Sequence, residues 1–229
     1  MTSPSYSCGP GEIHLWRIVL KNVSLVVTSV LSPDERQRAA RFRFEKDRCE
    51  FAITRGVLRH LLGAYTTHRP ELIHFHRRER GKPSVDGNVQ FNVSHSGGVA
   101  VIAISKSLVG VDVERVVSNF PWEAIANNFF PEEDREWIAA LPDSSRATGF
   151  YRCWTRREAY VKALGSGVPT EAACGLSPLM FDGRSCWSIQ SFTPFSGFIG
   201  AIAVHRAQYC IRILNWQSDC FCSFLNGIQ

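Results

Sequence analysis

The sequence contains no run of about eighteen apolar residues, so no segment is expected to span a membrane. Residues 1–11 lack a basic stretch followed by an apolar core, and we therefore expect no secretory signal. Charged residues make up 21% of the chain and hydrophobic residues 45%, which excludes a disordered chain, a collagen-like repeat and a coiled coil. The 229 residues carry no linker or low-complexity segment, and their number suits one large domain or two small ones.

Cysteine is not scarce, since eight are present. Without a secretory signal they are expected to be reduced thiols in the cytoplasm. The net charge is +5, but residues 36–82 hold thirteen Lys and Arg against five Asp and Glu, a local charge of +8. The rest of the chain is therefore net negative. Such a basic segment favours a polyanionic ligand (nucleic acid, a phosphorylated cofactor or an acidic protein), and a solvated basic surface is the alternative.

The order of predicted elements indicates an α/β (α+β) fold. Alternating apolar residues over 12–28 predict one or two strands, and Ser32-Pro33-Asp34-Glu35 has the composition of a helix start. That helix is expected to reach Leu62, with a break near Phe44 and an end at Gly63. Further helices are predicted from Pro131 and from about 145 to 164. Short strands are expected over residues 75–80, 89–93, 99–105, 109–113, 198–204 and 208–214.

This order suggests an internal duplication, in which each half has helices followed by about three strands. The seam is expected within residues 111–117. We therefore divide the chain into residues 1–112, which carry the basic segment, and residues 113–229, which carry the long helix near 145–164.

Two acidic residues stand on one predicted strand, in the sequence Gly110-Val111-Asp112-Val113-Glu114. Residues two apart face the same side of a strand, so Asp112 and Glu114 project together. Their carboxylates repel each other unless a cation lies between them, and hard oxygen ligands of this kind suit Mg²⁺. A solvent-facing sheet edge is the alternative.

The second group of polar residues lies on the predicted helix WTRREAYVK, where Trp154, Glu158 and Lys162 share one stripe at four-residue spacing. An ordinary surface ion pair between Glu158 and Lys162 is the alternative. A third group, Ser94 and His95, is predicted to lie in a small polar turn whose backbone N–H groups can hold phosphate oxygens. Lys82 lies in a basic turn upstream.

Together, FNVSHSGG, GVDVE and WTRREAYVKALGSG, in this order and spacing, resemble the motifs of 4′-phosphopantetheinyl transferases of the surfactin-synthetase-activating type. The segment SPDERQRAARF and the turn GKP fit the same family, and the resemblance covers about residues 12–205. It implies Mg²⁺-dependent transfer of the 4′-phosphopantetheine arm of coenzyme A to a serine of an apo acyl or peptidyl carrier protein. The products would be the holo carrier and 3′,5′-ADP, as for a holo-[acyl-carrier-protein] synthase. The implied fold is a pseudo-dimer of two similar α/β halves, with coenzyme A and Mg²⁺ in the cleft between them.

The resemblance also assigns roles to residues. Asp112, Glu114 and Glu158 would be the metal ligands, and Glu158 would also be the base that deprotonates the carrier serine. Lys162 would contact the phosphates and the leaving group, so that Glu158, Lys162 and Asp112 form the catalytic set. The expected coenzyme A contacts are Arg38, Arg77, Arg80, Lys82, Ser94, His95 and Lys162. The resemblance implies an acidic carrier protein as partner, no nucleic acid or membrane, and a monomer.

Two positions depart from the family pattern. Arg157 stands where the family commonly has Lys, and Glu35 stands where some relatives carry a second basic residue for the nucleotide. Neither is a metal-binding acid, so we expect an active enzyme. The alternatives are a carrier-protein-binding homologue without catalysis and a basic nucleic-acid-binding module that uses Phe42, Phe44 and Phe51. We expect these three aromatic side chains to lie in the core instead.

Overall fold

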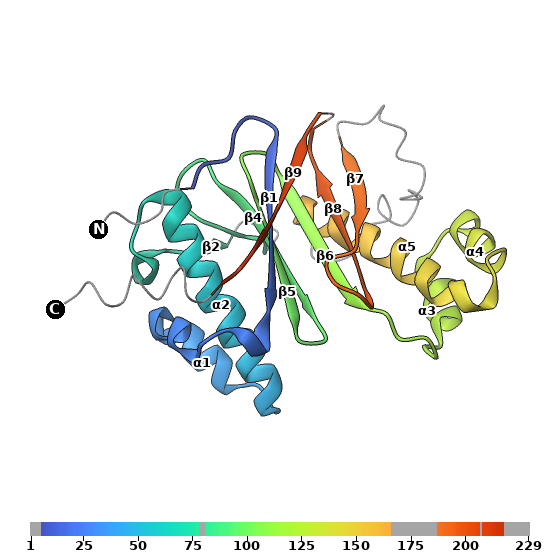
Figure 1. The fold of residues 1–229 in the computed structure, drawn as a ribbon, viewed down its shortest axis with the longest axis horizontal. Coiled ribbons are helices and arrows are strands. Elements are labelled where there is room, and N and C mark those ends of the chain that lie inside the picture. The colour runs from blue at the N-terminus through green and yellow to red at the C-terminus, as the bar shows by residue number, and fades with distance from the viewer. Residues whose placement is uncertain (1–5, 78–80, 166–186, 207, 218–229) are drawn as a thin grey trace.

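The structure, a computed structural model, describes residues 6–77, 81–165, 187–206 and 208–217. It contains two main sheets and one short strand pair (Figure 1). The first sheet has the order β4-β5-β1-β9. Its strands are β1 (Glu12–Val19), β4 (Gln90–Ser96), β5 (Val99–Ser105) and β9 (Cys210–Asn215). The second sheet has the order β6-β8-β7. Its strands are β6 (Val109–Arg115), β7 (Ser188–Phe192) and β8 (Phe198–Val204), and the short pair is β2 (His76–Arg77) with β3 (Pro83–Ser84).

Helices gather on the outer side of each sheet. The α-helices are α1 (Pro33–Ala40), α2 (Glu45–Thr66), α3 (Trp122–Phe129), α4 (Glu132–Ala139) and α5 (Asp143–Leu164). Short 3₁₀ helices span η1 (Leu20–Asn22), η2 (Leu25–Val30) and η3 (Pro70–Leu72). Figure 1 shows α1 and α2 on the side of the first sheet and α3, α4 and α5 on the side of the second. Within the described ranges, no helix combines the length and the apolar character that crossing a membrane requires.

The two halves repeat one arrangement of elements. In the first half, β1 leads to a 22-residue helix, α2, and then to β4 and β5. In the second half, β6 leads to a 22-residue helix, α5, and then to β7 and β8. In both cases the last strand lies in the middle and is antiparallel to its two neighbours from the same half. The duplication and the predicted α/β pseudo-dimer fold are confirmed.

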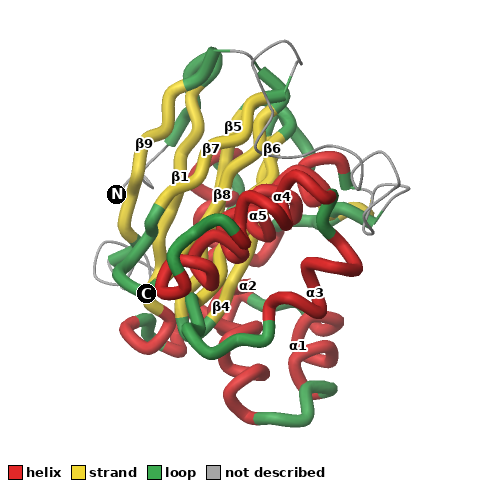
Figure 2. The backbone as a smooth tube through the Cα atoms, turned by 90° about the vertical axis from the view of Figure 1, so that its right-hand side faces the viewer, coloured by secondary structure: helices red, strands yellow, loops and turns green. Residues whose placement is uncertain are grey.

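One core lies between the two sheets, and a larger one lies between the first sheet and α2. Strand β5 is buried along its whole length, so its alternate residues pack in opposite directions. Ala100, Ile102 and Ile104 join the core under α2. Val99, Val101 and Ala103 join β1, β6 and β8 in the core shared by both sheets. The molecule is therefore layered as helix, sheet, sheet and helix, and Figure 2 shows α5 in front of the strands that it covers.

Helix α5 lies unusually close to β6. The residue that permits this approach is Gly110, where an added Cβ would come within 2.0 Å of the Ala159 carbonyl oxygen and 2.4 Å of the Ala163 nitrogen. Ala159 and Ala163 are themselves small and buried, and they pack against Ala201 and Ala203 of β8. The absence of bulky side chains at this contact places the helix, and thereby Glu158 and Lys162, directly beside the strand that carries Asp112.

Several local predictions are confirmed. The Ser32 N–H donates to Glu35 Oε2 at 3.0 Å at the start of α1, and a break at Phe44 separates α1 from α2. Helix α5 ends at Gly165, which has a left-handed φ of 74°.

Two local predictions are wrong. Leu25–Val30 form a 3₁₀ helix instead of a strand, because this segment packs on α2 rather than beside another strand. Helix α2 continues past Gly63 to Thr66 and ends at Thr67, whose φ of 58° is left-handed. Gly63 instead permits a close contact, since a Cβ there would lie 2.7 Å from the His68 carbonyl oxygen.

The two halves are joined by more than the chain between them. The predicted division at 112/113 falls inside β6, which begins at Val109. Strand β9 returns to the first sheet and pairs in parallel with β1, so that Glu12 lies opposite Cys210. The chain thus crosses from one half to the other twice, and the division into residues 1–112 and 113–229 stays a prediction.

Candidate active site

The polar segment after Val93 is a strand and not the predicted turn. Strand β4 runs through Ser94 and His95 to Ser96, and the turn follows at Gly97 and Gly98, whose φ angles are 57° and 86°. Residues 94–96 continue the strand because they pair with residues 99–101 of β5 across this tight turn. The Ser94 and Ser96 hydroxyls bond to β6, which supplies the stabilisation that local propensity lacks.

Asp112 is the centre of the site. Its side chain is only 3% exposed. Its Oδ1 atom accepts hydrogen bonds from the Ser94 hydroxyl at 2.8 Å and from Lys162 Nζ at 2.5 Å. Lys162 Nζ also donates to the Ser94 hydroxyl at 3.1 Å. Burial raises the pKa of Asp112, and the Lys162 ammonium and the Ser94 hydroxyl partly oppose that rise.

The charge of Asp112 acts on two further carboxylates: Glu114, which the strand spacing places beside it, and Glu158, which only the family resemblance placed there. Glu114 accepts a hydrogen bond from the Ser96 hydroxyl at 2.7 Å, and burial, followed by the charges of Asp112 and Glu158, raises its pKa. Glu158 is half-buried on α5, and its pKa is raised by burial and then by the Asp112 charge. The charges of the three acids therefore interact. Glu158 and Lys162 are thus not an isolated surface pair.

The fit of this site to a divalent cation rests on an unpaired oxygen. Among the described residues, no three or more His, Cys, Asp or Glu side chains form a ready-made metal site. However, Asp112 Oδ2 is buried without a hydrogen-bond partner, which is costly for a carboxylate. Together with Glu114 and Glu158, it offers hard oxygen donors in a region where negative charges raise one another's pKa. The donor set thus fits Mg²⁺, although the positive charge beside Asp112 is that of Lys162.

The predicted coenzyme A contacts lie in different surroundings. His95 is exposed on β4, and its pKa is lowered, chiefly by partial loss of water around the ring. Arg38 is exposed at the last turn of α1, with its guanidinium 5.0 Å from the centre of the Phe51 ring. Lys82 is buried, and its Nζ donates to the carbonyl oxygens of Val109 at 2.8 Å and Ala163 at 3.2 Å. Lys82 thus braces the first half against β6 and the end of α5.

Two predicted contacts are only partly within the described residues. The backbone of Arg77 belongs to β2, and Arg80 lies outside the described ranges. The structure accordingly adds nothing to the role predicted for either side chain.

The two departures from the family pattern have structural roles outside the acid cluster. Glu35 is buried and pairs with Arg55 and with Arg59, its Oε2 lying 2.6 Å from Arg59 Nε. It thereby fixes α1 on α2. Arg157, which precedes Glu158 on α5, is buried, with Nη1 3.7 Å from Asp134 Oδ2 and its guanidinium 5.6 Å from the Phe130 ring centre. The Arg157 side chain, which stands where the family commonly has Lys, is therefore part of the contact between α5 and α4.

The expectation that Phe42 and Phe44 belong to the core is wrong. Phe44 is 61% exposed and Phe42 36% exposed, because the break between α1 and α2 turns both side chains outward. Phe42 packs on Phe51 with ring centres 5.4 Å apart. The basic segment thus carries aromatic as well as positive surface.

Sequence reasoning missed the role of Ser96 and Asn92. Ser96 binds Glu114, and the Asn92 side-chain oxygen accepts the Val111 N–H at 2.9 Å. The available signal was the period of two: Asn92, Ser94 and Ser96 share one face of β4, as Asp112 and Glu114 share one face of β6.

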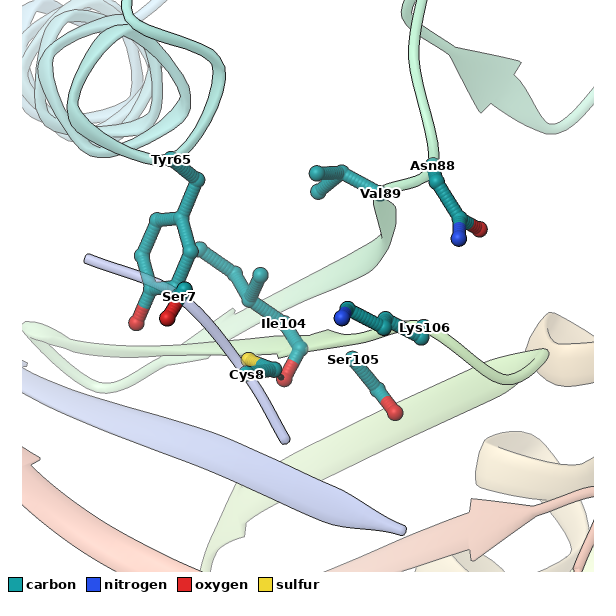
Figure 3. A pocket seen from close by; sticks show the side chains of 8 residues that line it. All are labelled: Ser7, Cys8, Tyr65, Asn88, Val89, Ile104, Ser105 and Lys106. Carbon is teal, nitrogen blue, oxygen red and sulfur yellow. Dashed lines mark hydrogen bonds between the residues drawn. The ribbon is translucent and has the colours of Figure 1, made fainter. Parts of the chain in front are cut away.

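A separate cavity lies at the other end of β5. It has a volume of ≈ 200 Å³. Its lining residues are Ser7, Cys8, Tyr65, Asn88, Val89, Ile104, Ser105 and Lys106 (Figure 3). Burial raises the pKa of the Cys8 thiol to about 11, so the thiol is neutral, and its Sγ donates to the Ile104 carbonyl oxygen. None of the predicted site residues lines this cavity, which is therefore distinct from the acid cluster.

Both halves of the chain match family models. The model of the 4′-phosphopantetheinyl transferase superfamily matches residues 108–198. The model of the 4′-phosphopantetheinyl transferase N-terminal region matches residues 15–107. The two matches meet between β5 and β6, next to the strands that carry Ser94 and Asp112.

Individual relatives agree with these models. The chain is 33% identical over 215 residues to 4′-phosphopantetheinyl transferase HetI of Nostoc sp., covering 88% of this chain and 91% of the relative. It is 33% identical over 161 residues to 4′-phosphopantetheinyl transferase gsp of Aneurinibacillus migulanus, covering 69% and 64%. It is 31% identical over 157 residues to 4′-phosphopantetheinyl transferase AcpT of Escherichia coli K12, covering 67% and 75%.

Proposed function

Since the chain belongs to the 4′-phosphopantetheinyl transferase superfamily, we propose that it moves the 4′-phosphopantetheine arm of coenzyme A to a serine of an apo acyl or peptidyl carrier protein. The products are the holo carrier and 3′,5′-ADP, and the enzyme is of the surfactin-synthetase-activating type. The observation that carries the proposal is the cluster of Asp112, Glu158 and Lys162, in which a strand and a helix present two acids and an ammonium group together. A carrier-binding homologue without catalysis has no need of this arrangement.

In the proposed reaction, the serine oxygen of the carrier attacks the phosphorus that bears the pantetheine arm. A bond from that oxygen to phosphorus forms, and the bond from phosphorus to the bridging pyrophosphate oxygen breaks. Glu158 takes the serine proton. Its raised pKa supports this role, because a base whose pKa lies closer to neutral pH binds the proton more readily in the transition state.

Lys162 and a cation held by the acids would stabilise the negative charge of the pyrophosphate. The Lys162 ammonium, placed at the end of α5, stabilises negative charge on the departing 3′,5′-ADP. Asp112, Glu114 and Glu158 would hold Mg²⁺, which supplies positive charge to the pyrophosphate when bound. The unpaired Oδ2 of Asp112 supports this assignment.

The proposed nucleotide contacts come from the first half. Arg38 and His95 are exposed and available to the 3′-phosphate, and Ser94 lies next to His95 on β4. Arg77, Arg80 and Lys82 remain predicted contacts of coenzyme A. The local charge of +8 over residues 36–82 supports a phosphorylated ligand and an acidic carrier protein. The protein is proposed to act as a monomer, because its two halves already form the pseudo-dimer.

The test is incubation of the protein with coenzyme A, Mg²⁺ and a panel of apo carriers from fatty-acid, polyketide and nonribosomal peptide synthesis. We expect at least one carrier to gain the mass of a single phosphopantetheinyl group, measured by intact-protein mass spectrometry. An Asp112→Ala variant is the negative control. If the wild-type protein modifies none of the carriers, the proposed function is wrong, and retention of a labelled oligonucleotide by the same preparation would favour the nucleic-acid-binding alternative.

A further inference from the structure

The edge of β6 is bound by side chains instead of by a neighbouring backbone. Strands β4 and β6 belong to different sheets, yet they lie side by side. On one face of β4, every second side chain over residues 92–96 accepts a hydrogen bond from an N–H group of β6. The N–H groups that donate also belong to every second residue. The pairs are Asn92 with Val111 at 2.9 Å, Ser94 with Val113 at 3.3 Å and Ser96 with Arg115 at 3.2 Å. We call Asn92, Ser94 and Ser96 the polar row.

The two serines of the polar row make a second hydrogen bond that Asn92 does not. Each serine hydroxyl also donates to the acid that precedes its backbone partner on β6: Ser94 to Asp112 and Ser96 to Glu114. At the corresponding place beside Asn92 stands Gly110, which has no side chain. The row therefore contains one member that only joins the strands and two members that join the strands and bind an acid.

The direction of these hydrogen bonds determines what they can do. A serine hydroxyl has one proton and two lone pairs. Because the Ser96 oxygen accepts the Arg115 N–H, its position is fixed by the backbone of β6, and its proton is free to go to Glu114 Oε2. Hydrogen bonds linked in series in this way strengthen one another. The flexible Glu114 side chain is thus held by one oxygen, and its second oxygen stays available to a ligand.

We infer that Ser96 is a positioning residue, which holds the Glu114 carboxylate in place for a divalent cation, and that Ser94 does the same for Asp112. This inference rests on the proposed function, because it assigns Glu114 and Asp112 to the metal. Ser96 touches neither coenzyme A nor the carrier serine in this scheme. Its effect reaches the reaction only through the orientation of Glu114. Hydrogen-bond partners of metal ligands commonly change metal affinity by 10- to 100-fold when they are removed.

The matched pair of variants is Ser96→Ala and Asn92→Ala. Both remove one hydrogen bond from β4 to the edge of β6, so both are expected to lower the melting temperature by a similar amount. Only Ser96→Ala releases a carboxylate. Ser96→Thr keeps the hydroxyl on a residue that strands tolerate well, and it serves as the rescue.

The measurement is the dissociation constant of Mn²⁺, read from the loss of the free-ion signal in electron paramagnetic resonance, with and without coenzyme A. We expect Ser96→Ala to weaken Mn²⁺ binding about tenfold or more, Asn92→Ala to leave it unchanged, and Ser96→Thr to restore it. In transfer assays, the KM for Mg²⁺ should rise for Ser96→Ala more than kcat falls.

The outcomes separate the inference from the proposed function. If wild-type protein binds Mn²⁺ and modifies a carrier, while Ser96→Ala binds Mn²⁺ as tightly as wild type, the positioning role is wrong and the transferase activity stands. Equal weakening by Ser96→Ala and Asn92→Ala also overturns the positioning role, because it shows a general effect of the strand contact. Failure of wild type to bind Mn²⁺ under both conditions overturns the metal assignment together with the inference.

Discussion

Lys162 Nζ lies 2.5 Å from Asp112 Oδ1, and this contact joins α5 to β6 across fifty residues of sequence. The Lys162 side chain remains 31% exposed, whereas Asp112 is buried. One end of the pair is therefore fixed in the protein, and the other can reach a ligand. This geometry couples the electrostatics of the buried acid to whatever binds at the end of α5.

The coupling predicts the outcome of a double-mutant cycle. Lys162→Met leaves a buried carboxylate without its ammonium, and Asp112→Asn leaves the ammonium without its carboxylate. Each single change should cost about 1–3 kcal/mol, less than a fully buried pair would, because Lys162 is partly exposed. The double variant should cost clearly less than the two together. Free energies of unfolding from urea titrations test this, and additivity within about 0.5 kcal/mol would contradict the coupling.

Glu158→Gln separates binding from chemistry. The amide keeps the size of the side chain but cannot accept a proton. Turnover with a carrier protein should fall by about 10²–10⁴, while coenzyme A binding at saturating Mg²⁺ changes only a few-fold. The loss should appear in kcat, because the proton moves only on the way to the transition state. Recovery of most of the rate at higher Mg²⁺ would show that Glu158 is a metal ligand and not the base.

Arg38→Ala tests the nucleotide contact. If Arg38 binds the 3′-phosphate, the variant should lose about ten- to a hundredfold in affinity for coenzyme A and little for dephospho-coenzyme A. Isothermal titration with both ligands measures the difference. Lys82→Ala is the comparison, because the Lys82 ammonium binds two backbone carbonyls. We expect Lys82→Ala to lower the melting temperature and to reduce the affinity for coenzyme A and dephospho-coenzyme A equally. A selective loss of coenzyme A binding in Lys82→Ala would instead show that Lys82 contacts the 3′-phosphate.

Glu35→Gln should destabilise the first half. Burial by itself would raise the pKa of Glu35, but the hydrogen bond from Arg59, the Ser32 N–H and the Arg55 charge outweigh it, so the pKa is lowered from 4.5. The carboxylate therefore contributes stability above pH 4.5, and that contribution is lost as the pH falls through the lowered value. At pH 7 the variant should lose about 3–5 kcal/mol, because Arg59 stays buried without its partner.

The pH dependence of unfolding provides the check. From pH 7 down to about pH 3, the wild type should lose stability below pH 4.5, and the difference between wild type and Glu35→Gln should shrink over the same range. A difference that stays constant with pH would show that packing, and not the ion pair, is responsible.

Gly110→Ala should displace α5. The added methyl group would overlap the backbone of Ala159 and Ala163, which cannot move aside as a side chain does. We expect a loss of about 1–3 kcal/mol or more in unfolding free energy, and a fall in turnover because Glu158 and Lys162 move with the helix. Gly9→Ala is the control, since its nearest neighbour would be a side-chain oxygen at 3.4 Å. Equal stability of the two variants would contradict the close approach.

The sequence predicted the features that depend on local periodicity. The period of two placed Asp112 and Glu114 on one side of a strand, and the four-residue spacing placed Glu158 and Lys162 on one side of a helix. Strand β8 was predicted at its observed limits, 198–204. Turn and cap residues marked the start of α1, the break at Phe44 and the end of α5.

Features that depend on distant partners were not predictable in this way. The Ser94 and Ser96 hydroxyls accept hydrogen bonds from β6, about nineteen residues later, and no local pattern indicates that contact. The sequence around Lys82 is that of a basic turn. It gives no sign that the Lys82 ammonium binds the carbonyl oxygens of Val109 and Ala163. The outward position of Phe44 follows from the angle between two helices, which no local pattern encodes.

The pairing of β9 with β1 has a consequence for how the protein is made. Arg17 on β1 and Asn215 on β9, which hydrogen-bond to each other, are 198 residues apart. At about 5–20 residues per second, a ribosome needs about 10–40 s to synthesise that interval. During this time β1 of the nascent chain has one edge without its final partner, and such an edge can pair with other chains. The first half therefore completes its sheet only after translation has passed through the second.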